Sequence, residues 1–478
     1  MPKGANMNHW NLLQLTAVVL LSTCVSVFAE DKKSAKPNIL WIVAEDLGCD
    51  LACYGVKGSY TPNLDQLAKE GVLFTHAHTT AAICAPSRSS FMTGLYPHQV
   101  NAKYMRPGPP FVKKNLPEGV DVFTKYIRDA GYTIGLCGRP KRDWGFENPR
   151  LKPYDETDWN VVSAKQPFFC QFQYYETHPA FHPCPEHPVD TTKIELPPYT
   201  PETPAARKEF GLYLEYLTVL DTKVGDLITD LKKKGLYENT IIFFIGDNGP
   251  ALFRGKCFVH KRGIEMPLIV RVPAKYDVGI KPGTVNDELV SSLDLAPTFI
   301  DLVGGSVPSY LEGRILFGPH RRDEPEFLYA QWDNLDVVTD RVRSVFSKKW
   351  QYIRNFTPGI SYYEQGHRNV EAVRAAKEIY DQGKLPERYT SYFKPKPAEE
   401  LYDLEADPFE LTNLADEPSR KTDLENMRNA LQTWIKRTND SDQLEDPAMI
   451  KEMLRLQEEE RKAAVIQRRK KAKAPPED

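Results

Sequence analysis

The sequence lacks several features that would each place it in a special class. It has no marked basic excess: 62 Lys and Arg residues face 65 Asp and Glu residues, for a formal net charge of −3. That balance argues against nucleic acid as the main partner, because proteins that neutralise phosphates usually carry a clear basic excess. Beyond the N-terminus no apolar stretch is long enough to cross a bilayer, so we expect no membrane span. No internal repeat is present, and 41% hydrophobic with 27% charged residues is typical of a globular protein rather than a disordered or fibrous one.

The N-terminus has the pattern of a secretory signal peptide. A largely apolar stretch runs from Leu12 to Phe28, and Ala29 follows it where signal peptidase needs a small residue. We therefore expect residues 1–29 to be removed. A membrane anchor is disfavoured because a spanning helix needs about 20 apolar residues, and a lipoprotein site at Cys24 is disfavoured by Thr23 before it. The sequence predicts an exported protein, either periplasmic or secreted.

The cysteine count is odd once the signal peptide is removed. The eight cysteines are at positions 24, 49, 53, 84, 137, 170, 184 and 257. An exported protein can form disulfides, so the seven cysteines of the mature chain leave at least one without an intrachain partner.

Alternating strands and helices predict an α/β fold. Largely apolar runs at 38–44, 241–245 and 267–272 are typical of strands that are buried on both faces of a parallel sheet. Further strands are expected at 132–137 and 168–174, and helices at 61–71, 123–130 and 205–234. The order predicts a doubly wound, mostly parallel sheet with helices on both faces.

The character of the chain changes after about residue 305. Residues 343–354 alternate apolar and polar side chains, which predicts one half-exposed antiparallel strand, and residues 399–414 are rich in turn formers. We predict a large α/β domain over 30–305, a smaller α+β domain with an antiparallel sheet over 306–445, and a charged helical or disordered tail over 446–478.

The segment from Cys84 to Gly94 is the most informative part of the chain. It begins Cys-Ala-Pro-Ser-Arg and continues as a helix that closes at Thr-Gly. A helix N-terminus at Cys84 provides a dipole that favours a bound anion, and Arg88 faces the same way one turn later. By residue type alone, a cysteine of an exported chain is more often half of a disulfide.

This Cys-x-Pro-Ser-Arg segment resembles the signature of the type I, formylglycine-dependent sulfatases of the alkaline-phosphatase-like superfamily. Four more segments are similar to that family, in the same order: a first strand with an acidic pair, a Thr-Pro-Asn-Leu-Asp helix, a strand that ends in Asp-Asn-Gly, and a Glu-Leu-Tyr-Asp signature near the C-terminus. They lie at 37–46, 61–74, 243–249 and 400–415. The resemblance therefore covers nearly the whole mature chain.

The resemblance implies a sulfuric ester hydrolase that acts on a sulfated carbohydrate, with polysaccharide and heparan-type sulfatases as candidate subclasses. It also implies that a maturation enzyme converts Cys84 to formylglycine, whose hydrate carries two geminal hydroxyls. The chemistry agrees, because a sulfate ester needs a nucleophile, positive charge around the sulfate oxygens and an acid for the leaving alcohol.

Two pairs of polar residues at strand ends predict a metal site. Glu45 and Asp46 follow one buried strand, and Asp247 and Asn248 follow another. The carboxyl ends of parallel strands meet at one edge of a sheet, and an all-oxygen ligand set suits Ca²⁺ or Mg²⁺ rather than zinc. The resemblance implies one Ca²⁺ next to Cys84, although the family usually has Asp where this chain has Glu45. The alternative is that these residues only cap strands and form turns.

The resemblance also supplies the cationic residues. Lys256 matches a lysine that binds sulfate, and His178 matches a histidine on the substrate side. The family's Gly-Lys-x-His stretch corresponds to 138–142, with Arg139 at the Lys position and Lys141, or the next residue if the match slips, at the His position. The imidazole is lost there, so we expect His178 or Lys256 to act as the leaving-group acid.

Two alternative functions remain open at this stage. One is a phosphonate or phosphodiester hydrolase on the same fold. The other is a catalytically impaired protein that binds sulfated glycans, which the missing histidine near Lys141 suggests.

Overall fold

The structure of the chain is a computed structural model. It describes residues 36–105, 113–147, 152–335, 338–366 and 370–440, together with Arg455 and Glu459. The signal peptide predicted at 1–29 lies outside the described residues, and so does the tail predicted at 446–478 except for those two positions. None of the helices formed by the described residues combines the length and the apolar composition that crossing a bilayer requires.

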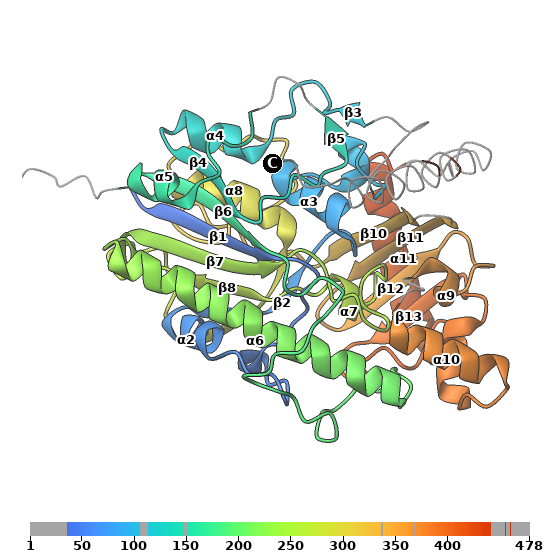
Figure 1. The fold of residues 1–478 in the computed structure, drawn as a ribbon. Coiled ribbons are helices and arrows are strands. Elements are labelled where there is room, and N and C mark those ends of the chain that lie inside the picture. The colour runs from blue at the N-terminus through green and yellow to red at the C-terminus, as the bar shows by residue number, and fades with distance from the viewer. Residues whose placement is uncertain are drawn as a thin grey trace, which may run out of the picture. The chain divides into compact units, whose positions relative to one another are not determined.

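The larger sheet is mostly parallel. Within the described residues it has seven strands, which are β1 (Asn38–Ala44), β2 (Val72–His78), β4 (Thr133–Gly138), β6 (Phe168–Tyr174), β7 (Thr240–Gly246), β8 (Leu268–Arg271) and β9 (Thr284–Ser291). Their order across the sheet is β4–β6–β1–β7–β8–β2–β9 (Figure 1). Only β8 of these strands runs against its neighbours β7 and β2, while the other neighbouring pairs are parallel. The predicted fold class is confirmed.

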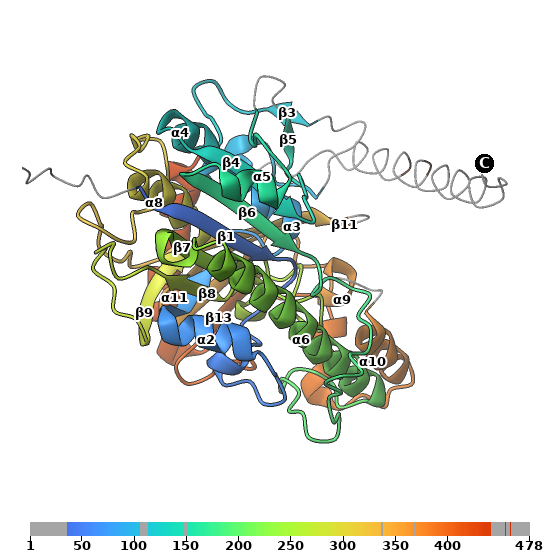
Figure 2. The ribbon, with the colours of Figure 1, turned by 60° about the vertical axis from the view of Figure 1, so that its left-hand side comes forward.

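Helices cover both faces of this sheet. They are α2 (Pro62–Glu70), α3 (Cys84–Thr93), α4 (Phe123–Asp129), α5 (Trp159–Ala164), α6 (Pro204–Lys233) and α8 (Leu295–Leu302). Successive side chains of β1 point to opposite faces. Trp41 packs with its ring centre 5.0 Å from that of Phe91 and 5.3 Å from that of Phe299, on the side of α3, α4 and α8. Leu40 lies in the other core, with Leu217 of α6. Figures 1 and 2 show α6 across one face and α4 and α8 over the other.

The long helix α6 begins and ends within one residue of the predicted bounds, 205–234. The Thr203 hydroxyl accepts a hydrogen bond from the Ala206 amide, and Pro204 occupies the first turn, where a missing N–H is tolerated. Beyond the helix, Gly235 has a φ of 67°, a left-handed conformation that glycine adopts without strain.

The smaller sheet is antiparallel throughout. Its strands, in order, are β10 (Leu328–Leu335), β11 (Val338–Phe346), β12 (Trp350–Asn355) and β13 (Glu399–Asp403). One face packs against α11 (Lys421–Arg437), and the other lies in a core shared with α10 (Glu371–Asp381). The remaining elements are α7 (Lys261–Ile264), α9 (Tyr362–Gln365), and a parallel pair of short strands, β3 (Lys114–Asn115) and β5 (Phe146–Glu147). The boundary at residue 305 between two domains stays a prediction.

The prediction of a single strand over 343–354 is wrong. The segment belongs to a hairpin in which β11 ends at Phe346 and β12 begins at Trp350. The Ser347 hydroxyl accepts a hydrogen bond from the Trp350 amide at 3.0 Å and so closes the turn. Three consecutive polar residues, Ser347, Lys348 and Lys349, interrupt the alternation at this turn, and the prediction of one strand overlooked that signal.

Candidate active site

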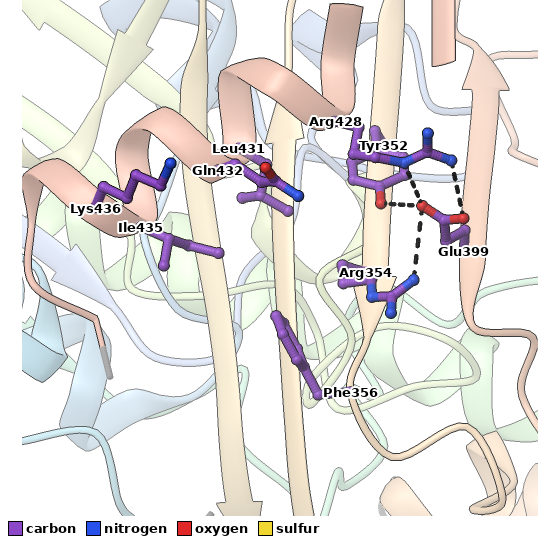
Figure 3. A pocket seen from close by; sticks show the side chains of 9 residues that line it. All are labelled: Tyr352, Arg354, Phe356, Glu399, Arg428, Leu431, Gln432, Ile435 and Lys436. Carbon is purple, nitrogen blue, oxygen red and sulfur yellow. Dashed lines mark hydrogen bonds and ion pairs between the residues drawn. The ribbon is translucent and has the colours of Figure 1, made fainter. Parts of the chain in front are cut away.

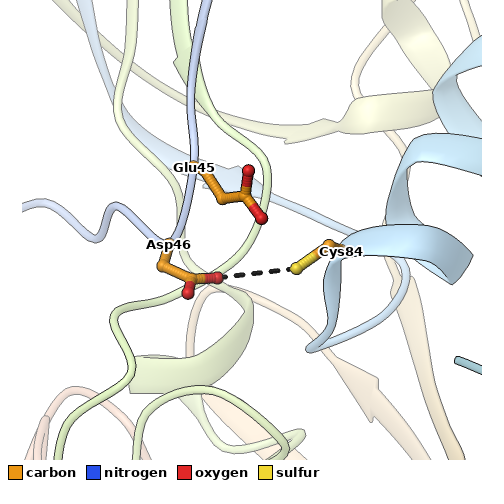
Figure 4. A group of neighbouring side chains, drawn as sticks. All are labelled: Glu45, Asp46 and Cys84. Atoms are coloured by element: carbon orange, nitrogen blue, oxygen red, sulfur yellow. Dashed lines mark hydrogen bonds between the residues drawn. The ribbon is translucent and has the colours of Figure 1, made fainter. Parts of the chain in front are cut away.

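Two neighbouring strands and one helix bring the predicted residues together. Glu45 and Asp46 follow β1, Asp247 and Asn248 follow β7, and these strands are parallel neighbours. The Asp46 amide donates to Asp247 Oδ1 at 2.8 Å. Asp46 has a φ of 54°, a left-handed conformation that Asp tolerates better than most residues. Ligand atoms of Glu45, Asp46 and Cys84 all lie within 4.8 Å of one another (Figure 4).

Cys84 is the first residue of α3, and every residue of this helix is buried. The Sγ atom lies 3.7 Å from Asp46 Oδ1. The Ser87 hydroxyl donates to the Asp247 carbonyl at 2.5 Å, which ties the first turn of α3 to the end of β7. Burial raises the pKa of the Cys84 thiol well above its usual value, and although Lys256 opposes this shift, the nearby carboxylates add to it. Cys84 is a free thiol, and so are Cys49, Cys53, Cys137, Cys170 and Cys184.

Buried cations face these carboxylates. Arg88 Nε donates to Asp247 Oδ2 at 2.8 Å, and its Nη2 lies 3.8 Å from Glu45 Oε2. Both terminal nitrogens of Arg88 are buried without a hydrogen-bond partner among the described residues. Lys256 Nζ lies 2.7 Å and 2.8 Å from the two oxygens of Asp46. Arg88 and Lys256 therefore lie at the positions where an anion next to Cys84 would need positive charge.

The buried carboxylates and cations of the cluster shift the pKa values of their neighbours. Burial would raise the pKa of Asp46, but the charges of Lys256 and His178 outweigh it and lower that pKa. Burial would lower the pKa of Lys256, but Asp46 raises it well above the usual value. The pKa of Asp247 is raised by burial and by the nearby carboxylates, with Arg88 opposing. Lys256 thus stays charged at neutral pH.

The structure separates the two cations of the loop after β4. Lys141 Nζ forms an ion pair with Glu45 and another, of 3.0 Å, with Asp143, and its side chain is only 9% exposed. Arg139 is exposed, and its guanidinium carbon lies 4.7 Å from the centre of the Tyr175 ring. The structure therefore brings Lys141, and not Arg139, into contact with the carboxylates of the cluster. The match of these two residues to the Gly-Lys-x-His stretch stays a prediction.

His178 lies at the solvent side of the cluster. It follows β6, its side chain is 39% exposed, and its Nε2 atom lies 3.8 Å from Asp46 Oδ2 and 4.0 Å from Glu45 Oε1. Its Nδ1 lies 2.6 Å from the Pro179 carbonyl oxygen. Because a carbonyl can only accept, Nδ1 carries a proton and Nε2 faces the site.

Sequence reasoning missed three residues that shape the site. Ser87 ties the first turn of α3 to Asp247 through a hydrogen bond. Asp143 forms an ion pair with Lys141, and the Tyr175 ring stacks with the Arg139 guanidinium. Ser87 belongs to the Cys-x-Pro-Ser-Arg segment, but that pattern does not reveal its contact with Asp247, and nothing in the sequence marks Tyr175 as a neighbour of the cluster.

The residues fit a bound hard cation. Glu45 Oε2 and Asn248 Oδ1 are buried and make no hydrogen bond within the described part of the chain. Orphaned buried oxygens of this kind are costly unless something binds them. Counting Glu45, Asp46, Asp143 and Asp247 against Arg88, Lys141 and Lys256, the cluster has one negative charge more than it has positive charges. A divalent cation would satisfy the free oxygens and make the cluster positive.

Comparison with known proteins agrees with this geometry. The family model described as Sulfatase matches residues 37–150 and 154–305, more than half of the chain, and the model of the C-terminal part of N-sulphoglucosamine sulphohydrolase matches residues 249–387. An ulvan-active sulfatase of Formosa agariphila is 30% identical over 93% of this chain and 84% of its own length. Human N-sulphoglucosamine sulphohydrolase is 26% identical over 85% of this chain and 91% of its own.

A solved structure shows the same fold. It is a complex with its substrate D-glucosamine-2-N,6-O-disulfate, and it aligns with a TM-score of 0.62 and 18% identity over 85% of this chain and 99% of its own. From these matches and the site described above, we conclude that the chain belongs to the sulfatase family and is an enzyme that hydrolyses sulfate esters or N-sulfates.

Proposed function

We propose that this protein is an exported sulfatase that removes sulfate from a sulfated carbohydrate, with Cys84 converted to formylglycine and one Ca²⁺ bound beside it. The observation that carries the proposal is the position of Cys84, at the N-terminus of a buried helix and among both carboxylates and cations. A hydrated formylglycine supplies a hydroxyl nucleophile that an un-ionised thiol cannot replace.

Each charged residue has a place in this proposal. Glu45, Asp46, Asp247 and Asn248 would hold the cation, since they provide the oxygens and two of those oxygens have no other partner. Arg88, Lys141 and Lys256 would bind the sulfate oxygens as negative charge develops there. His178 is the proposed acid for the leaving alcohol: as the doubly protonated imidazolium it would donate the proton of Nε2, which faces the site from the solvent side. Arg139 has no direct role in this arrangement.

The substrate class rests on the relatives. The similar proteins named above act on ulvan, on N-sulphoglucosamine and on a disulfated glucosamine. All are sulfated carbohydrates, so we propose the same class here. Partners would then be a sulfated glycan and, during biosynthesis, a formylglycine-generating enzyme.

The modification is tested by the mass of the peptide that spans Cys84. The protein is produced with and without a co-expressed formylglycine-generating enzyme, and the peptide should carry an aldehyde only in the first case. Turnover of an aryl sulfate should follow the fraction of aldehyde, and Cys84→Ala should lower kcat by several orders of magnitude. Full activity with an unmodified thiol would refute the proposal.

The cation is tested by chelation and reloading. Metal analysis of the purified protein should find about one Ca²⁺ per chain, and binding to the folded state alone should raise the melting temperature. Asp247→Asn should remove that thermal shift, and so should Asn248→Ala. An unchanged melting temperature when Ca²⁺ is added to the chelated protein would count against the site.

The reaction class is tested by a side-by-side assay. Sulfate release is measured from ulvan, heparan sulfate and chondroitin sulfate oligosaccharides, and an aryl sulfate is compared with the matching aryl phosphonate. The proposal predicts a higher kcat/KM for the sulfate. Preference for the phosphonate would favour the alternative hydrolase on the same fold.

A further inference from the structure

A charged cavity lies beside the smaller sheet. It has a volume of about 550 Å³ and opens between α11 and the strands β12 and β13 (Figure 3). That volume lies within the range of about 300–1,000 Å³ that is typical of ligand sites. None of the residues that line it belongs to the cluster around Cys84. Its polar and aromatic walls are formed by Tyr352, Arg354, Phe356, Glu399, Arg428 and Lys436.

The cavity is lined by more positively charged side chains than its one carboxylate, Glu399, can pair with. Glu399 is fully engaged, because Arg428 donates to its two oxygens at 2.8 Å and 3.0 Å and the Tyr352 hydroxyl donates at 2.5 Å. Arg354 approaches the same carboxylate only to 3.6 Å. Lys436 makes no ion pair with any residue in the described ranges. With Glu399 neutralised by Arg428, the charges of Arg354 and Lys436 remain available to a ligand.

Next to these cations the cavity offers apolar surface. The Phe356 ring is half-buried, and the guanidinium carbon of Arg341 lies 4.1 Å from its centre. Leu431 and Ile435 of α11 line the same cavity. The cations can pair with an anionic group. The aromatic ring and the aliphatic side chains can contact the apolar faces of a ring that carries this group. A sugar that carries sulfate or carboxylate has that chemistry.

We propose that this cavity is a second binding site for the polysaccharide substrate, and that it binds an anionic sugar residue of the chain through Arg354 and Lys436. The inference rests on the proposed function, because its ligand is the polymeric form of the proposed substrate. A second contact on the same polymer raises the effective concentration of sulfate groups near Cys84. A short substrate gains nothing from it.

The test is a binding measurement that does not depend on turnover. In the Cys84→Ala background, Arg354→Gln and Lys436→Gln are combined, which removes two charges from the cavity. The matched control combines Lys384→Gln and Lys421→Gln, two exposed lysines that do not line the cavity. Affinity electrophoresis in gels that contain ulvan or heparan sulfate gives Kd for each polymer, and melting temperatures check that the variants are folded.

We expect the cavity variant to bind at least one polymer about tenfold more weakly than its parent, with the control unchanged, since two charge-assisted contacts are lost. In the enzyme with an intact Cys84, the same pair of substitutions should raise KM for that polymer and leave kcat/KM for an aryl sulfate unchanged. Equal Kd values for the cavity variant and the control, or a parent that binds neither polymer, would overturn the inference. Failure of the proposed function differs, because the unaltered enzyme would then release no sulfate.

Discussion

Replacing Lys141 with methionine tests which cation of the loop after β4 takes part in the reaction. Methionine keeps much of the length of the side chain and removes its charge. Lys141 pairs with Glu45, whose side chain is fully buried, so the change leaves a buried carboxylate with only the longer contacts to Arg88 at 3.8 Å and to His178 at 4.0 Å. Breaking a buried ion pair by removing one partner costs about 3–5 kcal/mol. In the reaction, loss of one group that stabilises developing charge typically lowers kcat by about 10²–10³.

The matched control is Arg139→Met, two residues earlier in the same loop. Arg139 is exposed and only stacks on the Tyr175 ring at 4.7 Å, a contact worth about 0.5–1 kcal/mol. We expect its kcat/KM on an aryl sulfate to stay within about fivefold of the parent. Steady-state kinetics and the melting temperature of both variants are measured together. If Arg139→Met lost as much kcat as Lys141→Met, the placement of the two cations would be wrong.

Three further outcomes follow from the geometry. His178→Ala should reduce turnover of alkyl sulfates at least about tenfold more than that of aryl sulfates, which need little protonation; equal losses in a kinetic comparison would contradict an acid role. Burial would raise the pKa of Glu400, but its hydrogen bond from His260 lowers it from 4.5 to about 2. Because this pKa is lower in the folded state, the ionised Glu400 stabilises the fold above pH 4.5, and that contribution is lost as the pH falls toward 2. Glu400→Gln should therefore lower the free energy of unfolding by about 3 kcal/mol near neutral pH. Denaturant unfolding at several pH values should show that the stability of the variant depends less on pH between pH 5 and 2. Gly249→Ala would place a Cβ 2.0 Å from a backbone oxygen of α7, so it should impair activity, whereas Gly359→Ala, with open space around it, should not; similar rates for both would refute the clash.

Strands that are buried on both faces could be predicted because their sequence leaves few alternatives. The run from Asn38 to Ala44 is apolar at every position after the first, and each of its side chains is buried. The same holds for Thr240–Gly246 after its first residue. Residues that follow two such strands lie at one edge of the sheet, so the acidic pairs could be placed as well. An apolar run carries no direction, however, and the antiparallel orientation of Leu268–Arg271 could not be read from it.

The choice between Lys141 and Arg139 depends on a contact that is distant in sequence. Gln173 of β6 accepts a hydrogen bond from the Lys141 amide at 2.9 Å through its side chain. Its backbone carbonyl accepts one from the Arg139 amide at 3.0 Å. These two bonds fix the path of the loop and so decide which side chain points to Glu45. A motif aligned by residue type alone has no access to that information.

Because α3 is completely buried, the proposed conversion of Cys84 must take place before the chain folds. The thiol has no exposed surface and every residue from Cys84 to Thr93 is buried, so a second enzyme could reach this segment only on a chain that has not yet folded. Modification and folding would then compete in time, and a chain that folds first would keep its thiol permanently. The specific activity of a preparation would therefore measure the outcome of that competition, and slowing the folding step during biosynthesis would raise the yield of active enzyme without any change to the active site.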